Sequence, residues 1–131
     1  RWDVQAIEVN LRQGGTTHPY LALSAITAGQ LDLETGLYRS PTGQPLHYTA
    51  TDTFSDPALR GLLPIDLIDI VAEAGLHFDP ARLRGSVFHL LGCLSEYGKL
   101  GMTCIGRSPE EASEVYASTQ QQLLQQAIAK R

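Results

Sequence analysis

The chain has 131 residues, 43% of them hydrophobic, which suits one soluble domain with a core of its own. Its net charge of −4, without a cluster of basic residues, argues against binding to nucleic acid or to an anionic membrane surface. No apolar run approaches the roughly 20 residues that a membrane-spanning helix needs.

The strongest candidate for a functional site in the sequence is a polar motif near its start. Residues 7–12 alternate between apolar and polar side chains, which predicts a strand with Glu8, Asn10 and Arg12 on one face. Oxygen ligands such as a carboxylate and an amide suit Mg²⁺, and a guanidinium beside them suits a phosphate or a developing oxyanion. We therefore predict Glu8 and Asn10 as metal ligands and Arg12 as a catalytic residue.

The residues after this strand predict an anion-binding turn. Two glycines let the backbone approach a ligand, and the hydroxyl and imidazole side chains that follow can cap a helix whose first position suits Pro19. Free N–H groups at a helix start face anions well. The alternative, an ordinary solvated strand face, is less favoured because the turn follows the strand directly. The predicted phosphate- or substrate-binding residues are Gly14, Gly15, Thr16, Thr17 and His18.

The next segments predict a short helix, a loop and a strand. The helix covers residues 20–26 and ends before Gly29, and Gly36, Pro41 and Gly43 mark turns between residues 30 and 44. Residues 46–51 are rich in strand-forming side chains.

Clear boundary signals mark the later elements. A second helix starts at Pro64 and stops at Gly75, with a core stripe that includes Leu67 and Ile68. Residues 86–94 and 100–105 predict two antiparallel strands joined by a turn and covered on both faces. Ser108 caps the last helix, and Glu111 is expected to complete a capping box.

The elements together predict an α+β fold, a small antiparallel sheet with packed helices. Cys93 and Cys104 have neither metal-ligand spacing nor a disulfide framework around them. We expect reduced thiols and a cytoplasmic location.

The opening motif resembles the last metal-binding strand of ATP-grasp ligases, in which a Glu-x-Asn pair binds magnesium beside ATP. With residues 98–103 and 108–112, residues 8–19 look most like ATP-grasp peptide ligases of the pheganomycin-forming type. The resemblance implies that Glu8 and Asn10 hold Mg²⁺, that Arg12 steadies an acyl phosphate, and that the turn lines the acyl-phosphate or the amine side of the site.

The same resemblance implies a division of the chain and a missing partner. Residues 1–30 would be the terminal strand, turn and helix of an ATP-grasp domain, and residues 31–131 a carboxyl-terminal α+β domain. The phosphate-covering loop and the earlier acidic ligand would lie upstream of Arg1, so this fragment alone would be inactive and would need the upstream domain to bind ATP and Mg²⁺.

The sequence therefore leaves two alternative hypotheses for the function. The first is part of an ATP-dependent carboxylate–amine ligase, which acts on small-molecule or peptide carboxylates and amines. The second is a non-catalytic interaction or dimerisation module that retains the motif as a relic. A biotin-dependent carboxylase is less favoured, because the acid that precedes the histidine in that family is absent before His18. The region after Gln30 could cover the active site or form a homodimer, and no residue pattern decides between these roles.

Overall fold

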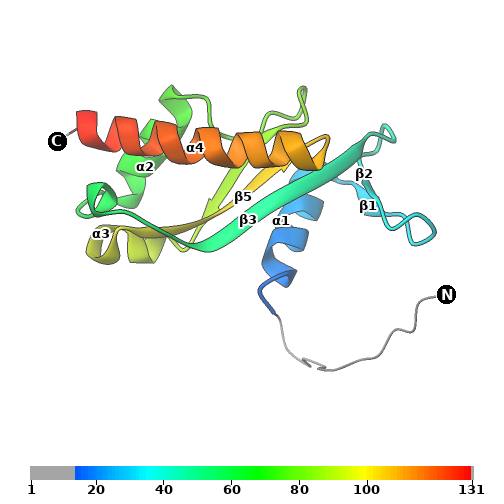
Figure 1. Cartoon of the computed structure of the whole chain (residues 1–131), viewed down its shortest axis with the longest axis horizontal. Coiled ribbons are helices and arrows are strands. Elements are labelled where there is room, and N and C mark those ends of the chain that lie inside the picture. The colour runs from blue at the N-terminus through cyan, green and yellow to red at the C-terminus, as the bar shows by residue number, and fades with distance from the viewer. Residues whose placement is uncertain (1–13, 131) are drawn as a thin grey trace.

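The computed structural model describes residues 14–130, so the predicted residues Glu8, Asn10 and Arg12 lie outside the described part (Figure 1). Five strands form an antiparallel sheet in the order β1-β2-β3-β5-β4. The strands are β1 (Gln30–Leu31), β2 (Tyr38–Arg39), β3 (Pro45–Ser55), β4 (Gly85–His89) and β5 (Lys99–Gly106). The helices are α1 (Thr17–Thr27), α2 (Pro64–Glu73), α3 (Leu94–Tyr97) and α4 (Pro109–Ala129). The predicted α+β class is confirmed.

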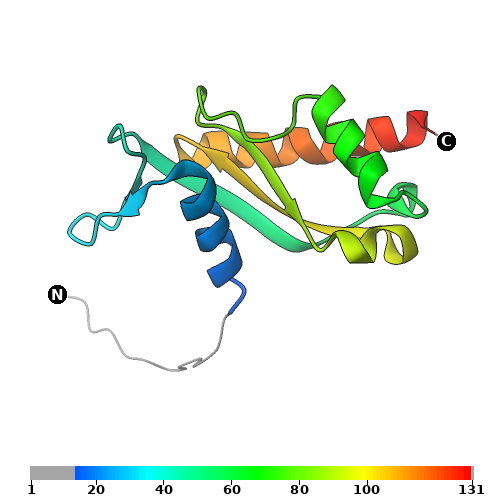
Figure 2. The same cartoon turned by 180° about the vertical axis from the view of Figure 1, so that it is seen from behind.

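Helices cover both faces of the sheet. The long helix α4 lies across β3 and β5 on one face, and α1 lies on the opposite face (Figures 1 and 2). The central strand β5 is covered on both sides, and this explains its continuous run of apolar residues. Alternate residues of β5 therefore belong to two different cores.

The larger core fills the space between the sheet, α2 and α4. It includes Leu100, Met102 and Cys104 of β5, all fully buried. Cys93 and Cys104 are free thiols, and burial raises the pKa of the Cys104 thiol to about 11.

The smaller core holds α1 on the other face. Leu23 of α1 packs with Tyr38, Leu46 and Ile105 of the sheet. The α1 helix thus rests on strands of the following part of the chain, while the division of the chain at residue 30 stays a prediction.

The last helix begins as its sequence predicts, with one difference. Oγ of Ser108 accepts a hydrogen bond from the Glu111 N–H at 3.1 Å. The Glu111 carboxylate does not close a capping box on Ser108 but accepts the Arg107 N–H at 2.7 Å, one residue earlier. It also pairs with the Arg107 guanidinium, whose hydrogen bonds lower the pKa of Glu111 below its usual range.

Ser108→Ala should lower the free energy of unfolding by about 1 kcal/mol, because it leaves the first turn of α4 without its side-chain acceptor. Urea denaturation of the chain measures this loss. Ser95→Ala, at an exposed position of α3, is the matched control and should change stability by less than about 0.5 kcal/mol.

Two details of the predicted elements are wrong. Ile68 is 54% exposed. Helix α2 turns Leu67 toward the core, as predicted, together with Ile70 rather than Ile68. The strand predicted for residues 86–94 ends at His89, because Leu90 adopts a left-handed conformation (φ 57°) that starts a helical connection through α3. β4 lies at an edge of the sheet, and its antiparallel pairing with β5 is as predicted.

Candidate functional site

A closed turn leads into α1. The backbone N–H of Thr17 donates to the carbonyl oxygen of Gly14 at 3.0 Å, and the Gly14 N–H donates to Oγ1 of Thr17 at 3.1 Å. Gly14 and Gly15 have no atom of the described residues within 4 Å of the place where a Cβ would stand. The backbone of this turn is therefore open to a ligand.

The start of α1 offers few backbone donors. Thr16 precedes the helix without a side-chain capping bond, and Pro19 is its third residue rather than its first. Proline has no N–H, and the Thr17 N–H is already bonded within the turn. Among the first three residues of α1, the donor that remains is the N–H of His18.

The imidazole of His18 lies against that of His89 at the end of β4. The ring centroids are 4.0 Å apart and the ring planes are tilted by 57°. This contact joins the first turn of α1 to the edge strand of the sheet, between residues that are 71 positions apart in sequence.

A glycine in the central strand makes room for His89. His89 pairs across β4 and β5 with Gly101. A Cβ on Gly101 would stand 2.2 Å from Nε2 of His89, so the imidazole occupies space that any other residue would fill. The ring can therefore lie across β5 toward β3.

Asp52 lies on the other side of Gly101. The register between β3 and β5 shifts between Thr51 and Phe54, which leaves Asp52 in the irregular segment opposite Gly101. Such bulges often redirect a side chain beside a functional site. The row across the sheet runs from His89 through Gly101 to Asp52.

These elements enclose a hollow of about 470 Å³, which we call the histidine hollow. Its chemistry comes from the turn, the two imidazoles and one carboxylate. The residues concerned are Gly14, Gly15, His18, Asp52 and His89, with Leu90 at the rim.

The surroundings of His89 favour a neutral imidazole. Burial lowers the pKa of His89, and positive charge on His18 lowers it further, while the negative charge of Asp52 acts in the opposite direction. Nδ1 of His89 is buried and, among the described residues, has no hydrogen-bond partner. Oγ1 of Thr103, which is fully buried two residues after Gly101, is also without one. Unpaired buried polar atoms are rare and often mark functional positions.

Sequence reasoning located part of this hollow. Gly14, Gly15 and His18 line it, whereas Thr16 and Thr17 do not. Thr17 acts within the turn instead, through its bond to Gly14. His89 and Asp52 were not predicted as site residues. The sequence around each residue is typical of an ordinary strand. The pairing register that brings the two residues together cannot be inferred from either segment alone.

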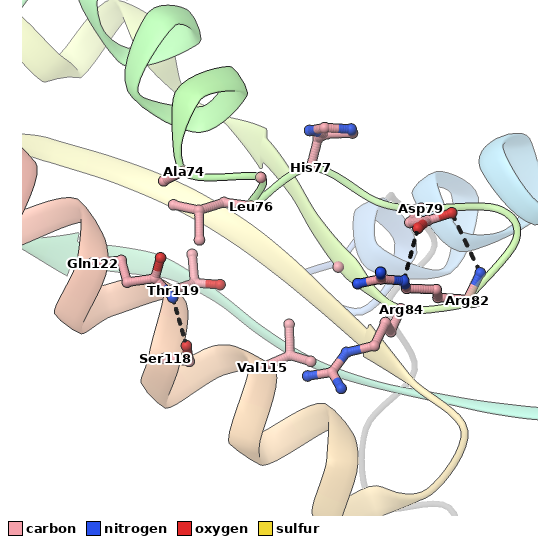
Figure 3. Close-up of a pocket in the computed structure, with 12 residues that line it drawn as sticks. Ala74, Leu76, His77, Asp79, Arg82, Arg84, Val115, Ser118, Thr119 and Gln122 are labelled. Carbon is pink, nitrogen blue, oxygen red and sulfur yellow. Dashed lines mark hydrogen bonds and ion pairs between the residues drawn. The ribbon is translucent and has the colours of Figure 1, made fainter.

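A second cavity, of about 500 Å³, lies on the other side of the molecule, between α4 and the loop after α2 (Figure 3). Its arginines already have partners. Arg82 pairs with Asp79 at 3.4 Å, and Arg84 reaches toward α4, where it pairs with Glu111 at 3.6 Å.

Residues 14–130 contain no group of three or more histidine, cysteine, aspartate or glutamate side chains placed to hold a metal ion. Within the same range, none of the helices combines the length and the apolar character needed to cross a membrane.

Comparison with known proteins agrees with the predicted resemblance to a ligase. Residues 66–119, from α2 to the middle of α4, match the family model of the PGM1 C-terminal domain. The chain is also 29% identical, over 119 residues, to an L-propargylglycine–L-glutamate ligase of Streptantibioticus cattleyicolor. The match covers 91% of this chain and 24% of that ligase, so the chain spans about a quarter of its relative. No solved structure matches the chain significantly.

Proposed function

We propose that this chain is the carboxyl-terminal part of an ATP-dependent carboxylate–amine ligase and is inactive without the upstream region. The observation that carries the proposal is the similarity to a ligase along 91% of the chain. The predicted metal-binding motif lies directly before the turn that lines the histidine hollow.

The reaction would form an amide or peptide bond in two steps. ATP phosphorylates a carboxylate, and an amine then attacks the acyl phosphate and displaces inorganic phosphate. Each step needs donors that offset negative charge on transferring oxygens. A small-molecule or peptide carboxylate and an amine are the substrates of this proposal.

The residues of the opening motif would handle the phosphates. Mg²⁺ would neutralise charge on ATP, held by Glu8 and Asn10 together with an acidic ligand from the upstream domain. Arg12 would stabilise the carboxyl oxygens as the acyl phosphate forms. The turn from Gly14 to His18 would then line the substrate side of the site, because it opens onto the histidine hollow.

The full-length protein tests the proposal. Incubated with ATP, Mg²⁺ and pairs of amino acids, it should release one ADP and one phosphate for each amide detected by mass spectrometry. The 131-residue chain alone should release none. If the full-length protein turns over no ATP with any pair and instead captures a protein partner or dimerises through this region, the interaction-module hypothesis replaces the ligase.

A further inference from the structure

The histidine hollow has the charge of a site for a cation rather than for a phosphate. Among the described residues that line it, none is lysine or arginine, and Asp52 contributes a carboxylate. At the start of α1, Pro19 has no N–H group and Thr17 uses its own within the turn. The carboxylate of Asp52 would attract an ammonium group there.

We propose that the histidine hollow binds the amine substrate of the ligase and that His89 accepts the proton that this amine gives up. The inference rests on the proposed function and names the substrate class of one part of its site. An α-amino group, with a pKa of about 7.7–8.0, is largely protonated at neutral pH and cannot attack until it loses a proton.

Each group in the hollow has a defined part in this step. The carboxylate of Asp52 holds the incoming ammonium group. A ring nitrogen of His89 takes one proton, and the freed lone pair forms the C–N bond with the acyl carbon. The bond from that carbon to the phosphate oxygen breaks, and inorganic phosphate leaves with the bonding electrons. The departing phosphate also takes up the second proton that the nitrogen loses as the amide forms. Nδ1 of His89 is buried, so the proposal assigns this proton to Nε2, which lies beside Gly101.

The elements around His89 keep it ready to accept a proton. His18 faces it from α1, Asp52 faces it from β3, and Gly101 of the central strand lies directly beside its ring. Burial and the positive charge of His18 lower the pKa of His89, while the negative charge of Asp52 acts in the opposite direction. Two titratable groups in contact, one of them with a shifted pKa, form a common arrangement for acid and base chemistry.

Two buried polar atoms beside the hollow are unpaired within the described part of the chain. Thr103 is fully buried, and its cross-strand neighbour Ala50 lines the hollow. Its hydroxyl oxygen and Nδ1 of His89 lack partners within the described part of the chain.

Hydroxylamine separates proton transfer from the rest of the reaction. This nucleophile is mostly unprotonated near neutral pH, so its attack on an acyl phosphate does not depend on an acceptor for the ammonium proton. In the full-length enzyme, His89→Gln should lower kcat/KM for amide formation about a hundredfold at pH 7, a typical loss for a general base. Hydroxamate formation should stay at the wild-type rate, and the amide defect should shrink as the pH rises above the pKa of the amine.

Two further variants address the same hollow. Gly101→Ala places a methyl group where the His89 ring lies and should reproduce the selective loss of amide formation without altering a titratable group. Asp52→Asn should raise KM for the amine about tenfold with little change in kcat, since it removes a charge-assisted hydrogen bond. His77→Gln and Asp69→Asn, at exposed positions away from the hollow, are the matched controls and should behave as wild type.

The outcomes discriminate between the ideas. Amide formation by His89→Gln at the wild-type kcat/KM would overturn the proton-acceptor role. Equal loss of amide and hydroxamate would also overturn it, because the variant would then be defective before the amine attacks. If the wild-type enzyme forms no hydroxamate with ATP and any carboxylate, the proposed ligase function itself fails.

Discussion

Glu8→Ala in the full-length enzyme is expected to abolish ATP turnover while leaving the fold of this region intact. The proposal makes Glu8 a magnesium ligand beside the ATP phosphates, and the charge stabilisation lost with such a ligand amounts to several kcal/mol. Since each 1.4 kcal/mol or so is a factor of ten in rate, the loss should reach roughly a thousandfold. Steady-state ADP release at saturating ATP measures it.

The control for this variant is Glu73→Ala, an exposed carboxylate near the end of α2. It should keep full activity. Thermal unfolding of both variants should match the wild type, which separates a lost ligand from a damaged fold. An active Glu8→Ala enzyme would remove the metal assignment of this residue.

Gly85→Ala should be the most destabilising of the small substitutions that we consider. Gly85 has φ +130°, and a Cβ there would stand 2.4 Å from the carbonyl oxygen of His77 and 2.6 Å from Cα of Phe78. Neither atom belongs to a flexible side chain, so backbone must move. Strain and overpacking each cost about 1–3 kcal/mol, which predicts a loss of about 3 kcal/mol or more.

The physical cause lies in the loop that follows α2. The Ser86 N–H donates to the Leu76 carbonyl oxygen at 2.9 Å, and the Phe78 N–H donates to the Ser86 carbonyl oxygen at 3.1 Å. Gly85 lets this segment approach the start of β4 closely enough to form both bonds. Gly85 and His77 are also among the residues that line the cavity shown in Figure 3.

Two other glycines supply controls in the same urea denaturation experiment. Gly92→Ala has open space and no positive φ, and it should leave stability unchanged. Gly36→Ala, with φ +69° but no nearby atom, should cost only about 1 kcal/mol for the conformation itself. Equal losses in Gly85→Ala and Gly36→Ala would contradict the role given to the close approach.

Signals that act within a few residues predicted the fold well. Pro64 fixed the start of α2, and Ser108 with Pro109 fixed the start of α4, because caps and prolines act on the backbone beside them. The apolar run of β5 correctly indicated a strand buried on both faces. The short helix α3 was not predicted. Nothing in the local sequence indicates that Leu90 adopts the left-handed conformation that starts the helical connection between β4 and β5.

The candidate site was predictable only where its residues are neighbours in sequence. Gly14, Gly15 and His18 stand in one turn and line one hollow. His89 and Asp52 meet there because β3, β4 and β5 pair in a particular register around Gly101. Register is a property of the assembled sheet, so a single strand does not reveal it. The roles of Glu8, Asn10 and Arg12 remain predictions.

The most direct test of the acyl-phosphate ligase follows an oxygen atom. The full-length enzyme is given ATP, Mg²⁺, an amine and a substrate carboxylate that carries a heavy-oxygen label. Mass spectrometry of the products should find one labelled oxygen in inorganic phosphate, because the carboxylate attacks the terminal phosphate of ATP and later loses that oxygen with it. Label in AMP, or amide formation that leaves no label in phosphate, would contradict the account.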